Sequence, residues 1–185
     1  MRKLIPATVL VLLVAARAWA VPPDDPRKDF QIAQDVAKSV QRYTQFTIFD
    51  DINASVKDGV VSLTGKVTMP YKRDDIARRI AKIDGVSHVD DRIDVLPVSS
   101  FDNELRYRIA RSIYGNSNFW NYAIMPNPPI HIVVERGRVT LTGVVNSEVD
   151  RMLARSLATQ FGALSVKNDL KTDAEVQAAL EKQSE

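Results

Sequence analysis

The stretch VKDGVVSLTGKV at residues 56–67 is repeated as VERGRVTLTGVV at residues 134–145. In each copy, apolar residues alternate with polar ones on both sides of a two-residue step, Asp58-Gly59 or Arg136-Gly137. Such alternation is typical of half-buried strands, and Asp-Gly is a favoured hairpin turn because both positions tolerate positive φ. The repeat therefore predicts two β-hairpins of one design.

The turns also predict which residues face each other across the hairpins. In the first hairpin Ile52 faces Gly65, and in the second Ile130 faces Gly143. A glycine within a strand usually marks the close approach of a neighbouring group. We therefore expect a helix or the isoleucine side chain to cross over each glycine. The other expected inner pairs are Val56 with Val61, Ala54 with Leu63, Val134 with Val139, and Ile132 with Leu141.

The repeat extends beyond the hairpins to both halves of the chain. Six of the seven glycines form pairs separated by 78, 78 and 77 residues, namely Gly59 and Gly137, Gly65 and Gly143, and Gly85 and Gly162. Apolar residues at helical spacing precede and follow each hairpin. Those before the hairpins are Phe30, Ala33, Val36, Ala37, Val40 and Tyr43, then Phe101, Leu105, Ile109 and Ile113; those after are Ile76, Ala77, Ile80 and Ile83, then Leu153, Ala154, Leu157 and Phe161. A short strand, at residues 89–95 or 166–172, closes each half.

This order of elements predicts an α+β fold of two tandem αββαβ domains, each a three-stranded mixed sheet covered on one face by two helices. The expected domains are residues 29–96 and 101–172, joined by a linker at 97–100. Residues 21–28 should be extended, and residues 173–185 should form a tail with a short, poorly anchored helix.

The first 20 residues have the layout of a cleavable signal peptide. Arg2 and Lys3 precede an apolar run at residues 4–16, and Ala18 and Ala20 are the small residues expected before a cleavage site. The alternative, an uncleaved membrane anchor, is disfavoured because the run is shorter than the ~20 residues that span a bilayer. We expect cleavage after Ala20.

Composition argues against several classes of function. The chain has 185 residues, of which 45% are apolar and 26% charged, as is typical of a folded globular protein. Without residues 1–20 the 25 basic residues fall to 22, against 23 acidic ones, so no surface for bulk nucleic-acid binding is expected. Because there is no cysteine, we expect no disulfide, thiol nucleophile, thiolate metal site or lipid-anchored cysteine.

The doubled phrase V-x-x-G-x-V-x-L-x-G-x-V and the later G-V-x-x-V-x-D-x-I at residues 85–93 resemble the BON domain, named for bacterial OsmY and nodulation proteins. The resemblance covers nearly all of residues 29–172 as two copies, although Ala163 follows Gly162 where the family usually has valine. It implies a binding module of exported or envelope proteins of Gram-negative bacteria, linked to osmotic-stress protection, chaperone-like activity and attachment to phospholipid membranes. The layout is similar to that of an OsmY-type soluble protein, so we expect a periplasmic location, soluble or peripherally attached to a membrane.

We recognise no catalytic, cofactor or metal site in the sequence. His88 and His131 lack the spacing of metal ligands. The carboxylate pairs lie beside turns or helix starts, where capping and solvation explain them: Asp50-Asp51, Asp74-Asp75 and Asp90-Asp91. One basic group is interspersed with acids and is expected to form a solvated helix face: Lys72, Arg73, Arg78, Arg79 and Lys82. We expect a non-enzyme with no cofactor, metal or small-molecule substrate.

A binding site is expected where the second half departs from the first, at an insertion of residues 115–129. Aromatic rings favour protein interfaces and the headgroup zone of membranes, and basic side chains beside them suit anionic lipid. The predicted lipid-binding or partner-binding residues are three rings of the insertion and three basic residues of the preceding helix: Phe119, Trp120, Tyr122, Arg106, Arg108 and Arg111. The alternative is that the rings pack against the other domain or within their own core.

Two functions follow as expectations. The first is an envelope protein that binds anionic phospholipid or an envelope partner and supports envelope integrity under osmotic stress. The second is a chaperone-like holdase that binds unfolded periplasmic clients on apolar or sheet-edge surface. Salt separates them, because screening weakens attraction between exposed charges but not burial of apolar surface.

Overall fold

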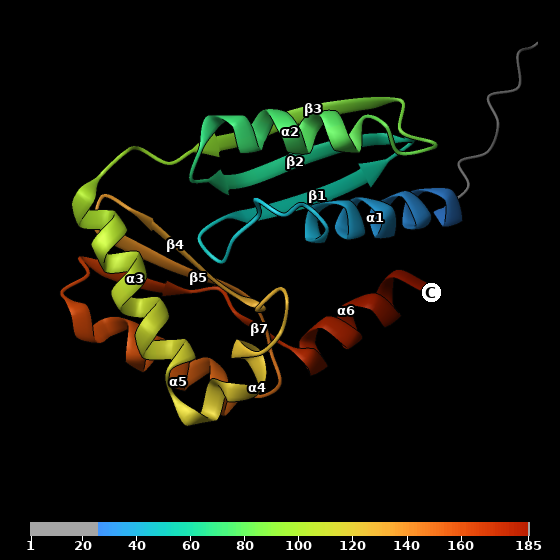
Figure 1. Ribbon diagram of the computed structural model, residues 1–185. Helices are drawn as coiled ribbons and strands as arrows, with labels where there is room; N and C mark the ends of the chain where they lie inside the picture. Colours follow the sequence, from blue (N-terminus) through green and yellow to red (C-terminus); the bar gives the residue numbers. More distant parts are fainter. Residues whose placement is uncertain (1–25, 185) are drawn as a thin grey trace, which may run out of the picture.

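The computed structural model describes residues 26–184 and shows two αββαβ units in sequence (Figure 1). The predicted signal peptide and residues 21–25 lie outside the described part. The first unit consists of α1 (Pro26–Gln41), β1 (Asp51–Lys57), β2 (Val60–Val67), α2 (Pro70–Ile80) and β3 (His88–Val95). The second consists of α3 (Ser100–Tyr114), η1 (Ser117–Phe119), α4 (Trp120–Ala123), β4 (Ile130–Glu135), β5 (Arg138–Val145), α5 (Glu148–Ala158), η2 (Thr159–Phe161), β6 (Ser165–Asn168) and β7 (Lys171–Thr172), followed by α6 (Asp173–Ser184).

Both sheets have the predicted mixed topology and hairpin register. The first hairpin strand pairs antiparallel with the second, which pairs parallel with the closing strand. Ile52 faces Gly65 and Ile130 faces Gly143, as expected. The closing strand of the second unit is interrupted between β6 and β7, yet the register with β5 does not change across the break, because Val139 pairs with Val166 and Val145 with Thr172.

The two hairpin turns have positive φ at both central positions, which is the geometry that matches the twist of the strands. The first residues, Asp58 and Arg136, have φ values of 53° and 50°. A carboxylate from the preceding helix holds each turn. Asp29 of α1 accepts from the amides of the first turn at 2.8 and 3.0 Å, and Asp102 of α3 accepts from those of the second at 2.8 and 2.8 Å.

The reason for the strand glycines differs from our expectation. A Cβ at Gly65 would lie 2.1 Å from the carbonyl oxygen of Asp51, and one at Gly143 would lie 1.8 Å from that of Pro129. The close neighbour is therefore the backbone of the partner strand, not a helix or an isoleucine side chain. Both glycines also have positive φ, 126° and 113°, which side chains rarely tolerate.

Each unit buries one apolar core beneath its helices. The first core includes Ile32, Val36, Val40, Leu63, Ile76 and Ile80, and the second includes Leu105, Ile109, Ile113, Phe119, Ile132 and Leu141. The first residue of two expected apolar stripes was assigned wrongly. Phe30 and Phe101 do not face the core but are 52% and 56% exposed. Helix α1 also begins at Pro26, inside the segment that we expected to be extended, as suits the fixed φ of proline in a first turn.

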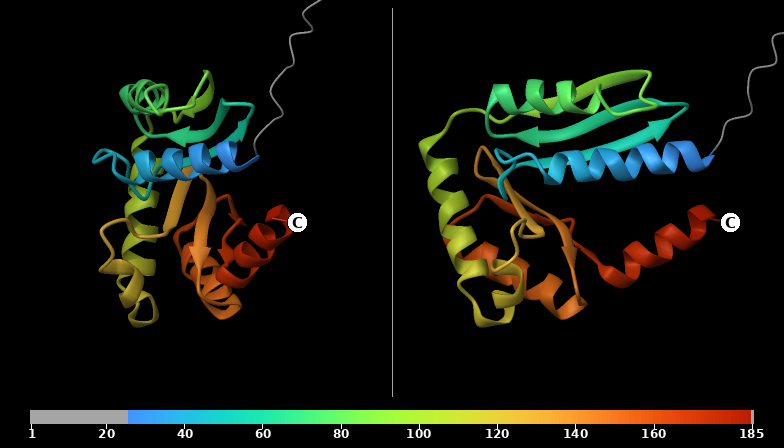
Figure 2. Two further views of the ribbon diagram at one scale, coloured as in Figure 1. Left: turned by 90° about the vertical axis from the view of Figure 1, so that its right-hand side faces the viewer. Right: turned by 45° about the vertical axis from the view of Figure 1, so that its right-hand side comes forward.

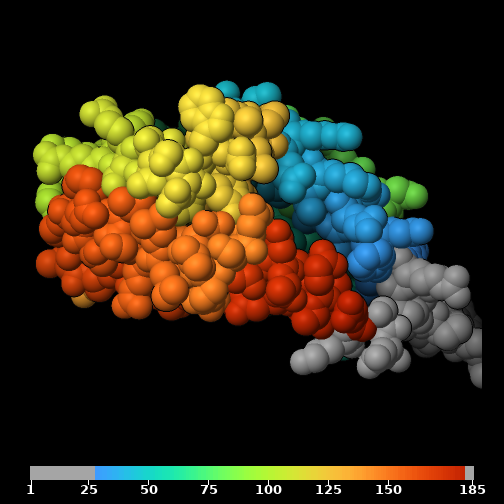
Figure 3. Space-filling view, turned by 90° about the horizontal axis from the view of Figure 1, so that it is seen from below, coloured from blue at the N-terminus to red at the C-terminus, as the bar shows by residue number. Residues whose placement is uncertain are grey.

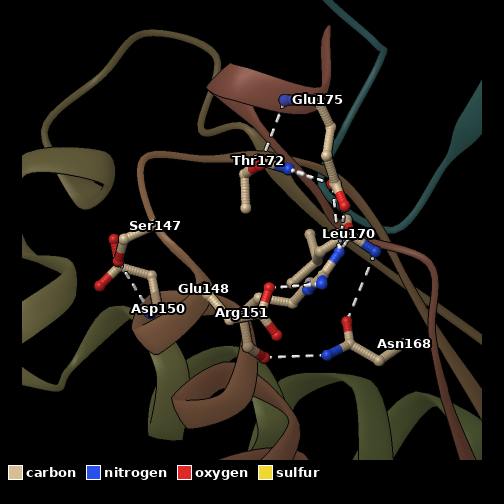
Figure 4. A network of polar contacts seen from close by, with 8 residues as sticks. All are labelled: Ser147, Glu148, Asp150, Arg151, Asn168, Leu170, Thr172 and Glu175. Carbon is tan, nitrogen blue, oxygen red and sulfur yellow. Dashed lines mark hydrogen bonds and ion pairs between the residues drawn. The ribbon is translucent and has the colours of Figure 1, made fainter. Parts of the chain in front are cut away.

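The start of α6 is anchored more firmly than the sequence suggested (Figure 4). The Arg151 guanidinium donates to Glu175 of α6 at 3.0 Å and also pairs with Glu148. Thr172 and Glu175 cap the helix reciprocally, because the Thr172 amide donates to the carboxylate at 2.8 Å and the Thr172 hydroxyl accepts from the Glu175 amide at 3.3 Å. Beyond this first turn, α6 extends alongside α1 in Figures 1 and 2.

Candidate functional site

The insertion between α3 and β4 has an inner and an outer side. Phe119 and Tyr122 are 0% and 3% exposed and belong to the second core, so neither can touch a membrane or partner directly. Placing them in the binding site was wrong, and the alternative of packing within their own core describes them. Trp120 points the other way and is 65% exposed.

Tyr122 takes a place that a carboxylate occupies in the first unit. In that unit Asp50 accepts from the Thr68 amide at 2.7 Å and from the Lys72 ammonium at 2.6 Å. In the second unit the Tyr122 hydroxyl accepts from the Asn146 amide at 2.8 Å and donates to Asp150 at 2.9 Å. Because Asn146 and Asp150 follow Thr68 and Lys72 by 78 residues, the repeat distance, the insertion supplies a hydroxyl where the first unit supplies a buried charge.

Lys72 therefore does not lie on a solvated face, as we had expected, but is 4% exposed. Burial alone would raise the pKa of the Asp50 carboxyl, but hydrogen bonds from Lys72, Thr68 and Thr47 lower it below its ordinary value. This arrangement satisfies a buried ion pair completely, and it indicates a structural role.

The three arginines of α3 divide between the interior and the surface. Arg106 is 4% exposed and donates to the carbonyl of Val134 at 2.5 Å, so its assignment to a lipid-facing surface was wrong. Desolvation by burial lowers the pKa of its guanidinium. Arg108 is exposed but pairs with Glu104, and Arg111 is exposed in the last turn of α3.

The exposed side of the insertion forms an apolar tip of Trp120, Ile124 and Met125, with exposed fractions of 65%, 63% and 45%. Tyr122 ties this tip to the start of α5 through Asn146 and Asp150. Helix α5 adds two exposed apolar side chains that our sequence analysis missed, Val149 and Met152, at 66% and 57%. Their exposure could have been predicted from the sequence, because both lie off the buried stripe of α5.

Two exposed basic side chains belong to α3 and α5, the helices that contact the insertion. Arg155 follows Met152 by one helical turn and is exposed, and Arg111 ends the neighbouring helix α3. Helices α3 and α5 contact each other on one side of the second sheet. Seen from below, the insertion (yellow), α3 and α5 (orange) form one end of the molecule (Figure 3). This surface of tip, α5 side chains and arginines is the first candidate site, and we call it the α4 tip.

The second candidate site is a groove of about 910 Å³ between the two units. One wall is formed by α1 and the edge strand β1, and the other by residues 126–129, the ends of β4 and β5, Lys171 and Val176 of α6. Sequence reasoning did not find it, because it exists only when both units are placed together.

Several contacts fix the two units against each other beside the groove. The Ile132 amide of β4 donates to the Ile48 carbonyl at 2.6 Å, and the Thr142 hydroxyl donates to Asp51 at 2.9 Å. Lys66 pairs with Glu135 across the same boundary. The two units therefore meet along the start of β1 and the edge of β4.

His131 lies at this boundary and also lines the groove. Its ring lies 5.2 Å from that of Phe46, and its buried Nδ1 has no hydrogen-bond partner in the structure. Burial lowers the pKa of this imidazole, while the backbone carbonyls of Asp50 and Thr47 and the charge of Asp51 act in the opposite direction. His131 is therefore an interface residue whose neutral form is favoured by burial.

No group of three or more histidine or acidic side chains in residues 26–184 is arranged to hold a metal ion. Nor does that stretch contain a helix with the length and hydropathy to cross a bilayer. The surfaces on which function can be argued are the α4 tip and the groove.

A model of the BON domain family matches the chain at residues 28–97 and 117–174, together well over half of its length. The second match begins after α3, although α3 packs on the second sheet. No curated protein matches the chain. Two solved structures of CdsD, a structural protein of the type III secretion system of Chlamydia trachomatis, show a distant likeness. One is 14% identical, with 80% of this chain and 97% of that chain covered and a TM-score of 0.29. The other, its C-terminal domain, is 13% identical, with 74% and 96% covered and a TM-score of 0.25. At such TM-scores, nothing about this chain follows from either likeness.

Proposed function

The chain belongs to the BON domain family, and from this premise we propose that it is a non-enzymatic periplasmic protein that binds anionic phospholipid and supports envelope integrity under osmotic stress. The family is generally linked to phospholipid binding and to envelope and osmotic-stress roles, and its members are generally non-catalytic. These general links support the proposal, and the surface of this chain supports a particular site for it.

The observation that carries the proposal is the α4 tip. Trp120, Ile124 and Met125 expose apolar surface to water at one end of the molecule. Apolar patches of this kind mark surfaces that bind a membrane or another protein. A tryptophan with an apolar body and a polar N–H suits the headgroup zone of a membrane. Arg111 and Arg155 are exposed on α3 and α5, the helices that contact the insertion, and each basic side chain contributes about 1 kcal/mol near an anionic surface.

These contributions describe peripheral attachment. Two arginines and one partly inserted ring supply a few kcal/mol, and the electrostatic part decreases as salt screens the charges. Binding should therefore be reversible, should require anionic lipid, and should weaken between low and physiological ionic strength.

The test is co-sedimentation with vesicles of phosphatidylglycerol and phosphatidylcholine, compared with vesicles of phosphatidylcholine alone. Trp120→Ala should weaken binding to the anionic vesicles by about tenfold, since it removes roughly 1.5 kcal/mol of burial. Val98→Ala is the matched control, because Val98 is 95% exposed in the linker and far along the chain from the tip. Equal sedimentation of wild type and Trp120→Ala would exclude the tip as the membrane site.

A second candidate function, the chaperone-like holdase, is favoured by one observation, the open groove between the units. Its walls combine apolar side chains with a sheet edge, which are the surfaces that unfolded segments bind. Client binding of this kind should persist at high salt, whereas binding to anionic vesicles should not.

A further inference from the structure

The outer edge of β1 is unpaired along one wall of the groove. Strand β1 is the first in the order β1-β2-β3, so only one side of it has a strand partner. Residues 53–55 are exposed, and Ile52 to Ala54 line the groove. Apart from the ladder with β2, the described residues make no backbone hydrogen bond to residues 52–56.

The register predicts which backbone groups point outward. A two-residue turn closes on a hydrogen-bonded pair, here Lys57 with Val60, and hydrogen-bonded pairs then alternate along the hairpin. Ile52, Ala54 and Val56 are therefore the residues whose N–H and C=O groups point away from β2. They form a row of free donors and acceptors at the spacing of a strand.

Edge strands are normally guarded by charges, prolines or bulges, and the closing strands of this protein follow that rule. Strand β3 carries Asp90, Asp91, Arg92 and Asp94 within eight residues, and β6 and β7 are short and interrupted. Between Asp51 and Lys57, in contrast, β1 has no charge, no proline and no bulge. The part of this edge from Ile52 to Ala54 lines the groove.

The α1 wall of the groove includes two small side chains. Ala33 and Ala37 of α1 lie one turn apart and present only methyl groups to the groove. Pro128 and Pro129 lie on the opposite wall. Because proline has no N–H, neither residue can donate a backbone hydrogen bond to β1. The charged lining residues, Asp51, Asp169 and Lys171, are of mixed sign, which favours a segment with little net charge.

The domain boundary lies next to this edge. The Ile48 carbonyl, three residues before β1, accepts from the Ile132 amide of β4 at 2.6 Å. Ile48 lies in the turn that leads into β1, so this contact lies beside the free edge. The chain's own Pro22 and Pro23 make the segment before α1 a poor partner, because proline has no N–H.

We propose that the groove binds an extended, weakly charged segment of another polypeptide, which adds as a strand to β1 with apolar side chains at alternate positions toward α1. The added segment would pair with Ile52, Ala54 and Val56, and it would span about 17 Å for five residues. The inference rests on the second candidate function and names its site; the membrane function of the α4 tip does not depend on it.

The probe is a fluorescein-labelled peptide with the sequence Lys-Thr-Val-Thr-Val-Thr-Val-Glu, whose side-chain charges cancel, titrated with the full chain and followed by fluorescence anisotropy. Wild type should bind saturably, with amide shifts in NMR spectra centred on residues 52–56. The same peptide with N-methyl groups on its valines should bind at least about tenfold more weakly, since it loses main-chain hydrogen bonds. Equal affinity for the two peptides would overturn the proposal.

Ala54→Pro is the decisive variant, because it removes an outward N–H without removing a bond to β2. It should lower peptide affinity at least about tenfold while leaving vesicle sedimentation unchanged. Ala54→Lys, which places a charge on the edge, gives a second variant if the proline disturbs folding. Trp120→Ala should bind the peptide like wild type. Unchanged peptide binding by a folded Ala54→Pro or Ala54→Lys protein would refute the site.

An aggregation assay separates this inference from the candidate function on which it rests. If wild type suppresses light scattering by heated citrate synthase and Ala54→Pro suppresses it equally, the holdase function stands and the β1 site is wrong. If neither protein suppresses aggregation but wild type alone binds the peptide, the site stands and the holdase function is wrong.

Discussion

Gly65 and Gly143 each face a backbone carbonyl that leaves no space for a side chain. Gly143→Val would force a Cβ to within 1.8 Å of the Pro129 oxygen at a φ of 113°, so the strands must separate. We expect a loss of at least about 3 kcal/mol in the free energy of unfolding, measured with urea. Gly162→Ala is the control, because its φ is 75° but nothing lies within 4 Å of the new Cβ. It should cost only about 1 kcal/mol; similar losses for both would show that φ strain alone is the cause.

The ion pair of Asp50 and Lys72 is a second case at the residue scale. Lys72→Met would leave a buried carboxylate without its charge partner and should destabilise the first unit by about 3–5 kcal/mol at pH 7. The pKa of Asp50 is lowered in the folded state, so its contribution is present above its ordinary value of 3.8 and is lost as the pH falls. The variant should therefore lose less stability, relative to wild type, at pH 3 than at pH 7. The exposed Arg78→Met provides a control with little effect at either pH.

Among the elements, the insertion shows how one short segment serves both the core and the surface. Phe119→Ala removes a ring that is 0% exposed and should cost about 3–5 kcal/mol of unfolding free energy. Trp120→Ala, one residue later, should change stability by less than about 0.5 kcal/mol. Thermal unfolding of the two variants beside wild type tests this directly. A large loss of stability in Trp120→Ala would mean that this ring is packed and does not form a free tip.

The same element shows why the fold could be predicted and the site only in part. The hairpin register follows from a two-residue turn, which is local information, so Val56 and Val61 could be paired from the sequence. Phe119 and Tyr122 are three residues apart and share one side, whereas Trp120 and Ile124 share the other. Our sequence analysis placed all three rings of the insertion in one binding site and so ignored this spacing. Which side faces inward depends on Asn146 and Asp150, which only the folded chain brings near.

On the scale of the whole molecule, the groove could not be predicted from the sequence, for a different reason. Its walls come from α1, β1, the insertion and α6, and repeat spacing carries no information on how one unit sits against the other. The contacts that place the units are a few polar bonds and two ring pairs, Phe46 with His131 and Phe49 with Tyr107. The groove exists only while these contacts hold.

Acid should loosen that boundary. Burial lowers the pKa of His131 below its ordinary value of 6.5, so the neutral ring stabilises the closed boundary above that pH, and this stability is lost as the pH falls through the folded-state pKa. The charged groups that face the ring, Asp50 and Asp51, are already engaged by Lys72 and by the Thr142 hydroxyl.

Hydrogen exchange of the Ile132 amide, which donates to Ile48 across the boundary, measures this loosening residue by residue. After correction for intrinsic exchange rates, its protection should fall between pH 7 and pH 5, while that of the Leu63 amide in the first core should not. His131→Phe should keep the ring contact with Phe46 and abolish the pH dependence, whereas His88→Gln, on an exposed residue of β3, should retain it. If protection in His131→Phe falls with acid as it does in wild type, another group controls the boundary.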